Sequence, residues 1–450
     1  MTKPSTPFPL PVGLLEKALA WINTRVQEGS DPQAGAQTFE ALDKVLQGSI
    51  TVDGIGGLPA FSLFTDVVVP SARPFDHPTS LSFVASAPTP GSLAFDAALS
   101  AAEIFAGNWD GGSGAIYAEN QALQWLIDLA GLPKEAGGVF VSGGTLGNLS
   151  ALHVARSKRE SDLGSRPVRW KLLASGGAHS SIAAAARVMD VDLVLVEADE
   201  YGRMKTDALA AAIQHPEEIF AVVANAGATN SGAVDDLEAI AALCGPHGIW
   251  LHVDGAYGLA ALASPTHKKV FAGIEHADSF IVDPHKWLFA PYDSCALVYR
   301  EPRHAALAHT QKAEYLEVID KTSWNPSDFA IHLTRRARGL PLWFSLATYG
   351  TNAYAQAIDT VMQTADEIAK GIDALPHIEL VIPPQLSVIL FRCPNMSLEQ
   401  MRQWAESHRR SGELLCLPTF WDGEPVFRIC VVNPATEANA ILNTLATLTP

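Results

Sequence analysis

Residues 277–289 read Ala277-Asp-Ser-Phe-Ile-Val-Asp-Pro-His-Lys-Trp-Leu-Phe289, and this stretch decides the fold. Its apolar run, residues 279–282, predicts a short buried strand that ends at Pro284. Lys286 therefore follows the end of a strand, which is where α/β enzymes place reactive groups. Burial there would lower the pKa of the lysine and make its amine a nucleophile toward a carbonyl. The alternative is a surface lysine whose stem covers apolar atoms.

Three further segments place polar side chains at strand ends. An apolar strand is expected in Ile249-Trp-Leu-His-Val-Asp-Gly-Ala-Tyr-Gly258, and Asp254 lies at its end. Val139-Phe-Val-Ser-Gly-Gly-Thr-Leu-Gly-Asn148 reads as a strand, a glycine turn and a helix start. Ser175-Gly-Gly-Ala-His-Ser-Ser181 sets His179 in a turn before an alanine-rich helix. A lysine, an acid, a phosphate-type turn and a histidine at the loop end of one sheet predict a pyridoxal-phosphate (PLP) site.

Each of these residue types suits one part of PLP. Lys286 supplies an amine, and Asp254 supplies the anion that keeps the pyridine nitrogen protonated. The turn Ser142-Gly-Gly-Thr145 offers backbone N–H groups, a helix dipole and a hydroxyl to a phosphate. His179 would stack on one ring face, opposite the methyl group of Ala256. Each feature alone has an ordinary interpretation: a helix cap, a glycine turn or a loop histidine.

Composition narrows the function classes. The 450 residues, 48% of them hydrophobic, can bury a large core in two or three domains. We expect a cytoplasmic protein, since no apolar run approaches about 18 residues and the start lacks a signal-peptide core. A net charge of −17 argues against nucleic acid or membrane partners. Five cysteines without CxxC spacing fit a reducing compartment, and HExxH, P-loop and GxSxG motifs are missing. No metal is expected.

The rhythm of the chain predicts the fold class. Short apolar strands alternate with helices, which indicates an α/β protein with a mostly parallel sheet covered on both faces. These strands are expected at 139–141, 171–174, 193–196, 220–224, 249–253, 279–282 and 296–299. A smaller α+β pattern follows, with strands at 386–391, 414–417 and 426–432. We therefore expect an N-terminal helical segment (1–75), a large PLP-binding domain (76–345) and a small C-terminal domain (346–450).

Four of these motifs resemble one known family. The motifs are Leu251-His-Val-Asp-Gly-Ala-Tyr257, Asp283-Pro-His-Lys-Trp287, Ala178-His-Ser-Ser181 and Gly143-Gly-Thr-Leu-Gly-Asn148. They resemble the group II PLP-dependent amino-acid decarboxylases, the family of aromatic-L-amino-acid and glutamate decarboxylases. The resemblance runs from about residue 77 to residue 343. It implies the type I fold of PLP-dependent transferases, a homodimer with active sites at the interface, and decarboxylation of an L-amino acid to an amine and CO2.

The resemblance also assigns roles to residues. Lys286 would bind the cofactor as an aldimine, Asp254 would pair with the pyridine nitrogen, and His179 would stack on the ring; these three are the expected catalytic residues. Gly144 and Thr145 would hold the phosphate. The remaining expected cofactor contacts are Thr229, Ala256, Asp283 and His285, and the expected substrate contacts are Ser86, Phe105 and Gly107. The amino-terminal segment 1–75 would pack on the dimer partner.

The chain departs from the family in one loop. Relatives carry a tyrosine there that returns a proton to the substrate's alpha carbon, whereas in segment 318–336 its position falls on Pro326 or Phe329. Either His332, His179 or water returns the proton, which gives an amine. Alternatively the carbanionic intermediate reacts with O2 and yields an aldehyde, as in aldehyde synthases. The amine is the favoured expectation.

Substrate choice and rival functions leave weaker signals. Gly107 stands where a bulky ring is expected, which predicts a roomier pocket, and the scarcity of arginine nearby disfavours glutamate. Arg335, Arg336 and Arg338 suggest a structural cluster. Another type I PLP reaction, such as transamination, would use an arginine in the small domain, for which Arg428 is the candidate. A scaffold without catalysis would need neither Lys286 nor Asp254.

Overall fold

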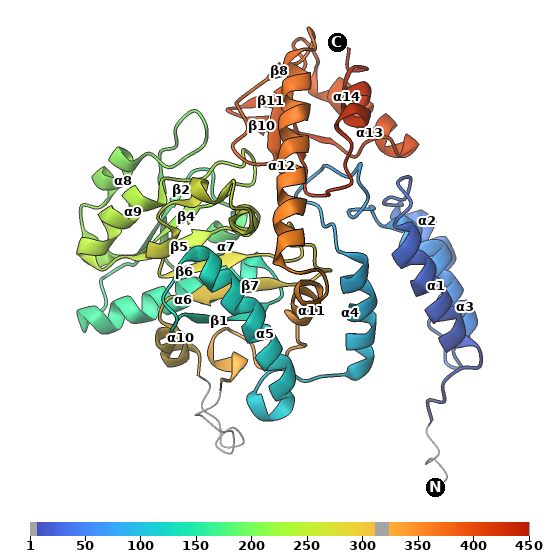
Figure 1. Cartoon of the computed structure of the whole chain (residues 1–450), viewed down its shortest axis with the longest axis horizontal. Helices are drawn as coiled ribbons and strands as arrows, with labels where there is room; N and C mark the ends of the chain where they lie inside the picture. Colours follow the sequence, from blue (N-terminus) through green and yellow to red (C-terminus); the bar gives the residue numbers. More distant parts are fainter. Residues whose placement is uncertain (1–6, 311–323, 450) are drawn as a thin grey trace.

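A seven-stranded sheet forms the centre of the molecule (Figure 1). The computed structural model describes residues 7–310 and 324–449. The strand order is β1-β7-β6-β5-β4-β2-β3, and only β7 runs antiparallel to its neighbours β1 and β6. The strands are β1 (Gly137–Val141), β2 (Lys171–Ser175), β3 (Asp192–Val196), β4 (Ile219–Asn225), β5 (Trp250–Asp254), β6 (Ser279–Val282) and β7 (Cys295–Tyr299). The prediction of a mostly parallel sheet is confirmed.

Helices cover both faces of this sheet because its strands are apolar on both sides. In β1, Val139 and Val141 belong to one buried cluster and Phe140 to the other, as alternation along a strand requires. Helix α6 (Gly144–Leu163) packs across five strands, from β4 to β1 in the sheet order. The other helices of this region are α4 (Pro90–Ala102), α5 (Trp109–Ala130), α7 (Ser180–Met189), α8 (Thr206–Ala212), α9 (Leu237–Cys244), α10 (Pro302–His309) and α11 (Leu340–Tyr349).

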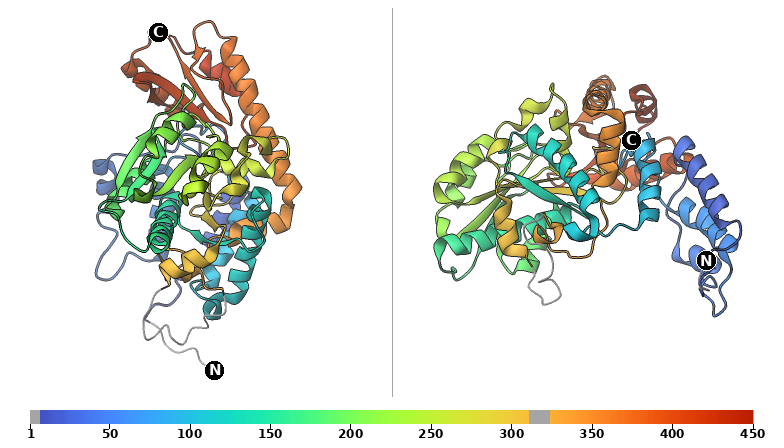
Figure 2. Two further views of the ribbon diagram at one scale, coloured as in Figure 1. Left: turned by 90° about the vertical axis from the view of Figure 1, so that its left-hand side faces the viewer. Right: turned by 60° about the horizontal axis from the view of Figure 1, so that its bottom comes forward.

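A second, antiparallel sheet lies at one end of the molecule (Figure 2). Its order is β10-β11-β9-β8, and the long helix α12 (Thr351–Asp373) leads to it from the large sheet. Its elements are β8 (Glu379–Leu380), β9 (Val388–Arg392), α13 (Leu398–Ser411), β10 (Leu417–Trp421), β11 (Glu424–Cys430) and α14 (Ala438–Leu445). The strand predicted at 414–417 was wrong: residue 415 instead pairs with the loop near residue 80, and β10 begins at 417.

The N-terminal helices lie at one side of the molecule, next to α4 (Figure 1). These are α1 (Leu14–Glu28), α2 (Phe39–Leu46) and α3 (Gly57–Leu63), and none of the three contains a buried residue. The sequence predicts only the first, from an amphipathic pattern around residues 13–26. Trp21 packs edge-on against the rings of Phe61 and Phe64, and Arg25 pairs with Asp76 at 2.7 Å. The domain boundaries near residues 75 and 345 stay a prediction.

One predicted turn is helical. The sequence Asn108-Trp-Asp-Gly-Gly-Ser-Gly114 predicts a turn because of its glycines, but α5 begins at Trp109. The Asn108 side chain caps it by accepting from the Gly111 N–H at 2.8 Å, which is a common way to start a helix. Its glycines leave a kink at Gly112. Within residues 7–310 and 324–449, no helix has the length and apolarity to cross a membrane.

Candidate active site

A cavity of about 560 Å³ opens at the carboxyl ends of five strands, β1, β2, β4, β5 and β6, beneath the small sheet. Carboxyl ends of parallel strands are the usual ligand sites of α/β folds, and the volume suits a cofactor with a small substrate. Its lining is Ser82, Phe83, Val84, Gly143, Gly144, Thr145, Asn148, His179, Gly227, Thr229, Asn230, Asp254, Ala256, Tyr257, Asp283, His285, Lys286, Leu417, Pro418, Thr419 and Arg428.

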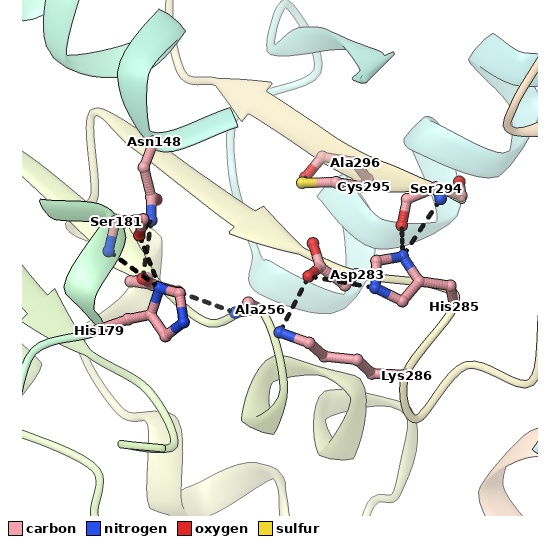
Figure 3. Close-up of polar contacts among 11 residues, drawn as sticks. Asn148, His179, Ser181, Ala256, Asp283, His285, Lys286, Ser294, Cys295 and Ala296 are labelled. Atoms are coloured by element: carbon pink, nitrogen blue, oxygen red, sulfur yellow. Dashed lines mark hydrogen bonds and ion pairs between the residues drawn. The ribbon is translucent and has the colours of Figure 1, made fainter. Parts of the chain in front are cut away.

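Lys286 enters this cavity paired with a carboxylate. Its Nζ lies 3.0 Å from Oδ2 of Asp283, because a backbone bond from the Lys286 N–H to the Asp283 carbonyl curls the chain after β6 (Figure 3). Burial pulls the pKa of Lys286 down, but the charges of Asp283 and Asp254 outweigh it, so the pKa is raised. The sequence-based expectation that the pKa of Lys286 is lowered was therefore wrong for the protein without cofactor.

Asp283 is the buried centre of this charge cluster. Burial raises its pKa, but the neighbouring Lys286 and His285 outweigh that effect and the pKa is lowered overall. The His285 Nδ1–H donates to the Ser294 carbonyl at 2.6 Å, and its Nε2 lies 3.7 Å from Asp283. Burial lowers the pKa of His285. Oδ1 of Asp283 has no hydrogen-bond partner within the described chain, so this oxygen can still accept a hydrogen bond.

Asp254 ends β5 and is held by two donors. Its Oδ2 accepts from the Asn148 side-chain amide at 2.9 Å, and its Oδ1 accepts from the Ala256 N–H at 3.2 Å. Both oxygens are thus acceptors, which suits a carboxylate rather than a carboxylic acid. The side chain is buried except for the part that faces the cavity. Asp254 therefore offers a fixed anion to a cationic or N–H group.

His179 lies between β2 and α7 and caps the helix. Its Nδ1 accepts from the Ser181 N–H at 3.2 Å and lies 2.8 Å from the Ser181 hydroxyl. These donors leave the proton of the neutral ring on Nε2. His179 thus has a structural task as the cap of α7, and its ring also lines the cavity. In Figure 3 it lies on the side of the site away from Lys286.

The start of α6 is built to receive an anion. Gly143 and Gly144 precede and open the helix, and no side chain of the described residues caps this end. The first N–H groups of a helix lack intrahelical partners, and they bind phosphate readily. A Cβ atom at Gly144 would lie 3.2 Å from Oδ2 of Asp283, so a side chain there would crowd the approach. The turn, the fixed anion and the buried lysine together fit PLP.

Most of the predicted site residues meet in the cavity. Those that line it are Gly144, Thr145, His179, Thr229, Asp254, Ala256, Asp283, His285 and Lys286. Ser86, Phe105 and Gly107 lie outside its lining. The Ser86 hydroxyl donates to the Ala290 carbonyl at 3.4 Å. A Cβ atom at Gly107 would lie 2.4 Å from the Leu333 carbonyl oxygen, which gives that glycine a packing role.

Comparison with known proteins decides the family. A family model, the pyridoxal-dependent decarboxylase conserved domain, matches residues 65–394. The chain belongs to this family. It is a PLP-dependent carboxy-lyase that acts on an amino acid. The decarboxylase is 32% identical over 385 residues to an aromatic-L-amino-acid decarboxylase of Bacillus atrophaeus. The aligned region covers 82% of this chain and 79% of that protein.

Two further comparisons agree with the assignment. An L-2,4-diaminobutyrate decarboxylase of Rhizobium meliloti is 30% identical, with 81% of this chain and 76% of that protein covered. The fold of the decarboxylase matches a structure of Oryza sativa TDC with PLP and tryptamine at a TM-score of 0.89 and 23% identity, covering 98% and 99% of the two chains. The predicted family, type I fold and cofactor are thereby confirmed.

Sequence reasoning missed several cavity residues. Asn148 was quoted only as the end of a motif, and its partners lie more than 30 residues away. Loop residues 82–84 and residues 417–419 at the start of β10 carry no motif, although they line the cavity. Arg428, noted as a transaminase-type arginine, is buried in its wall and donates to the Phe83 carbonyl at 2.7 Å. Its position between two sheets could not be read from local pattern.

The structure describes part of segment 318–336, in which the family's tyrosine is missing. Residues 318–323 lie outside the described residues. Pro326 and Phe329 are buried, and Phe329 stacks on Trp324 with ring centroids 4.1 Å apart, so neither lines this chain's cavity. Burial, together with the charges of Arg335 and Arg338, lowers the pKa of His332 to about 3. His332 is therefore neutral at pH 7, and it lies outside the cavity lining.

Proposed function

We propose that the cavity holds PLP with Lys286 as the attachment amine and that the enzyme decarboxylates an L-amino acid to an amine and CO2. The observation that carries this assignment is that the Lys286 amine and the Asp254 carboxylate line one cavity, although they come from different strands. The proposed catalytic residues are Lys286, Asp254 and His179.

The proposed cofactor contacts follow from the chemistry of the lining. Gly144 and Thr145 would bind the phosphate through the start of α6, and the Asp254 carboxylate would accept a hydrogen bond from the N–H of the protonated ring nitrogen. His179 and Ala256 would lie on the two ring faces, with Thr229 and His285 at the periphery. Asp283 is a poor phosphate ligand because like charges repel; we assign it to holding Lys286. When bound, PLP supplies an acceptor for the electron pair released as the carboxylate leaves.

The chain's own groups then have defined tasks. Lys286 must lose a proton before its amine can attack a carbonyl. The adjacent Asp283, held ionised by its neighbours, raises the pKa of Lys286 and so makes this loss less favourable. Asp254 keeps a proton at the ring nitrogen. For the proton that returns to the alpha carbon, we favour the protonated Nε2 of His179 or water over His332, because His332 is outside this chain's cavity.

We assign Arg428 to the substrate end of the cavity. Its Nη1 holds the Phe83 carbonyl, while Nε and Nη2 are buried without partners among the described residues. A strong guanidinium bond to the departing carboxylate would stabilise the ground state and slow decarboxylation. We therefore propose that Arg428 positions the Phe83 wall and a polar group of the substrate side chain. A transaminase would instead use it for the alpha-carboxylate.

We propose a cytoplasmic homodimer. Helices α1 to α3 bury no side chain in the single chain and expose large apolar residues such as Leu15, Leu19 and Phe39, which a partner surface would cover. Ser86, Phe105 and Gly107 lie outside this chain's cavity, so contacts of Phe105 and Gly107 with substrate would reach the partner's site. Five buried free cysteines suit a reducing compartment. The division at residues 75 and 345 is part of this proposal.

The test is a panel of L-amino acids given to the PLP-loaded protein. Release of CO2 with one equivalent of amine from at least one substrate supports the proposal. Aldehyde, ammonia and peroxide in place of amine would establish the oxidative alternative, which the lack of a loop hydroxyl at residues 326 and 329 favours. Transfer of the amino group to a keto acid without CO2 would overturn decarboxylation. The named relatives act on different amino acids, so the panel includes aromatic, diamino and acidic members.

A further inference from the structure

Asn148 connects three parts of the site. It lies one turn into α6, four residues after Gly144, so the helix that presents its N-terminus also points this amide into the cavity. Its Nδ2 donates to Asp254 Oδ2 at 2.9 Å and to the Ser181 hydroxyl at 3.0 Å. Its Oδ1 lies 2.8 Å from Nε2 of His252. The amide is buried and both of its N–H groups are used.

The direction of every bond is fixed. Asp254 only accepts, so the NH2 group of Asn148 must face it, and the amide oxygen must face His252. His252 therefore carries its proton on Nε2. Burial lowers the pKa of His252 to about 4, so the ring is neutral and its Nδ1 is an acceptor. The Ser279 hydroxyl, 2.8 Å away, donates to it.

The bonds of Ser279, at the end of the network away from Asp254, fit the same donor-to-acceptor order. The indole N–H of Trp250, which can only donate, lies 2.8 Å from the same Ser279 hydroxyl oxygen. Trp250, His252 and Asp254 alternate along β5 and so share one face. Ser279 is the register partner of His252 on β6. The pattern Trp-x-His-x-Asp thus builds a one-way chain of donors that ends at the Asp254 carboxylate.

The same amide also reaches His179. The Ser181 hydroxyl accepts from Asn148 and is 2.8 Å from Nδ1 of His179, so its own proton points to that nitrogen. Asn148, Ser181 and His179 are grouped in Figure 3. One side chain therefore holds the anion proposed for the ring nitrogen and, through Ser181, the ring proposed to stack on the cofactor.

We infer that Asn148 is a positioning residue that orients the Asp254 carboxylate toward the ring nitrogen of the cofactor, with His252 and Ser279 fixing the orientation of its amide. This inference rests on the proposed function, because it takes Asp254 as the partner of the ring nitrogen. Asn148 acts through Asp254 and takes no proton itself. Its loss should therefore weaken recognition of the nitrogen and leave recognition of the phosphate intact.

The test compares two cofactors on the apo full-length protein. One is PLP, and the other is its carbocyclic analogue, in which C–H replaces the ring nitrogen; both are titrated and the dissociation constants are measured. For Asn148→Leu, which keeps the volume and removes the donors, we expect PLP to bind about 10-fold or more weakly, since a hydrogen bond to a charged group is lost. The analogue should lose much less affinity than PLP, because it has no ring nitrogen for Asp254 to recognise and is affected only through the stacking ring of His179.

A second variant guards against misfolding. Ser279→Ala removes the remote acceptor of Trp250 and lies outside the cavity lining, so it should weaken PLP binding in the same selective way but less. Circular dichroism and the thermal midpoint check the fold of both variants. An equal loss for PLP and the analogue, or no loss for either, would overturn the role of Asn148. Failure of the wild type to bind PLP would instead remove the proposed function.

Discussion

Lys286 and Asp283 form an ion pair in the cavity, with Nζ 3.0 Å from Oδ2. The carboxylate is almost wholly buried and the lysine mostly so. The geometry comes from a turn of three residues after β6, which places the amine beside an acid from its own loop. The pair keeps the lysine charged, so loading with the cofactor is coupled to the loss of a proton that Asp283 and Asp254 hold in place.

Replacing Asp283 by asparagine should therefore accelerate cofactor loading. Without the nearest carboxylate, burial becomes the larger influence and the pKa of Lys286 falls, so more of the amine is neutral. We expect the rate at which the apo protein takes up PLP at pH 7 to rise several-fold, and the pH profile of uptake to move to lower pH. Stopped-flow absorbance measures both. Asp366→Asn, which removes an exposed lysine's partner, should change neither.

The same pair sets a pH window for the stability of the apo protein. The lowered pKa of Asp283 means that its stabilisation is present above the ordinary carboxyl range and is lost as the pH falls through the lowered value. The raised pKa of Lys286 means that its stabilisation is lost as the pH rises through the raised value. Asp283→Asn should thus be less stable than the wild type near pH 7, and the difference should shrink at either extreme of the range.

Replacing Lys286 by alanine should abolish the visible absorbance of bound PLP. It should also slow CO2 release by at least about 10³-fold, the scale seen when a covalent group is removed. The fold should persist, because no element depends on this side chain. Absorbance after gel filtration and circular dichroism measure the two effects. Lys370→Ala, on the exposed face of α12, serves as the control. Retained colour and activity in Lys286→Ala would contradict the assignment.

The sequence predicted those parts of the fold that depend on local pattern. Each strand of the large sheet was placed within two residues, because a fully apolar run of four to five residues between helices has few other structures. Nine proposed cofactor contacts line one cavity because they follow strands with the same direction. The prediction of a turn at residues 108–114 was wrong, because Asn108 caps a helix that includes the glycines of this segment.

Features that depend on distant partners could not be predicted. The role of Asn148 requires Asp254 and His252, which lie on another element more than 100 residues away. The raised pKa of Lys286 depends on the exact curl that brings Asp283 to it. The cluster of Arg335, Arg336 and Arg338 was predicted to be structural, and these side chains pair with Glu119, Asp96 and Asp293, respectively.

Replacing Arg428 by methionine should impair substrate binding more than chemistry. Methionine keeps much of the apolar stem but cannot hold the Phe83 carbonyl, so the substrate wall loses its support. We expect KM to rise about 10-fold, because a hydrogen bond from a charged donor is lost, while kcat changes less. Steady-state CO2 release measures both constants. Arg392→Met, an exposed arginine of neighbouring β9, is the matched control. A collapse of kcat with unchanged KM would favour a direct catalytic task.

Breaking the pair between Glu119 and Arg335 should destabilise the whole large domain. Arg335 binds both carboxylate oxygens, at 2.7 and 2.5 Å, and both side chains are almost completely buried. Glu119 also accepts from the Gly339 N–H at 2.8 Å, and Arg335 donates to the Ala106 carbonyl at 2.9 Å, so the pair joins α5 to two loops.

Glu119→Gln leaves a buried guanidinium without its counter-charge. We expect the free energy of unfolding to fall by about 3–5 kcal/mol, measured by denaturant titration. Asp96→Asn removes the partner of Arg336, whose side chain is over a third exposed, and should cost no more than about 1 kcal/mol because solvent screens that pair. Replacing both Glu119 and Arg335 by leucine and methionine should recover part of the loss, since no unpaired charge remains. An equal cost for the buried and the exposed pair would contradict this account.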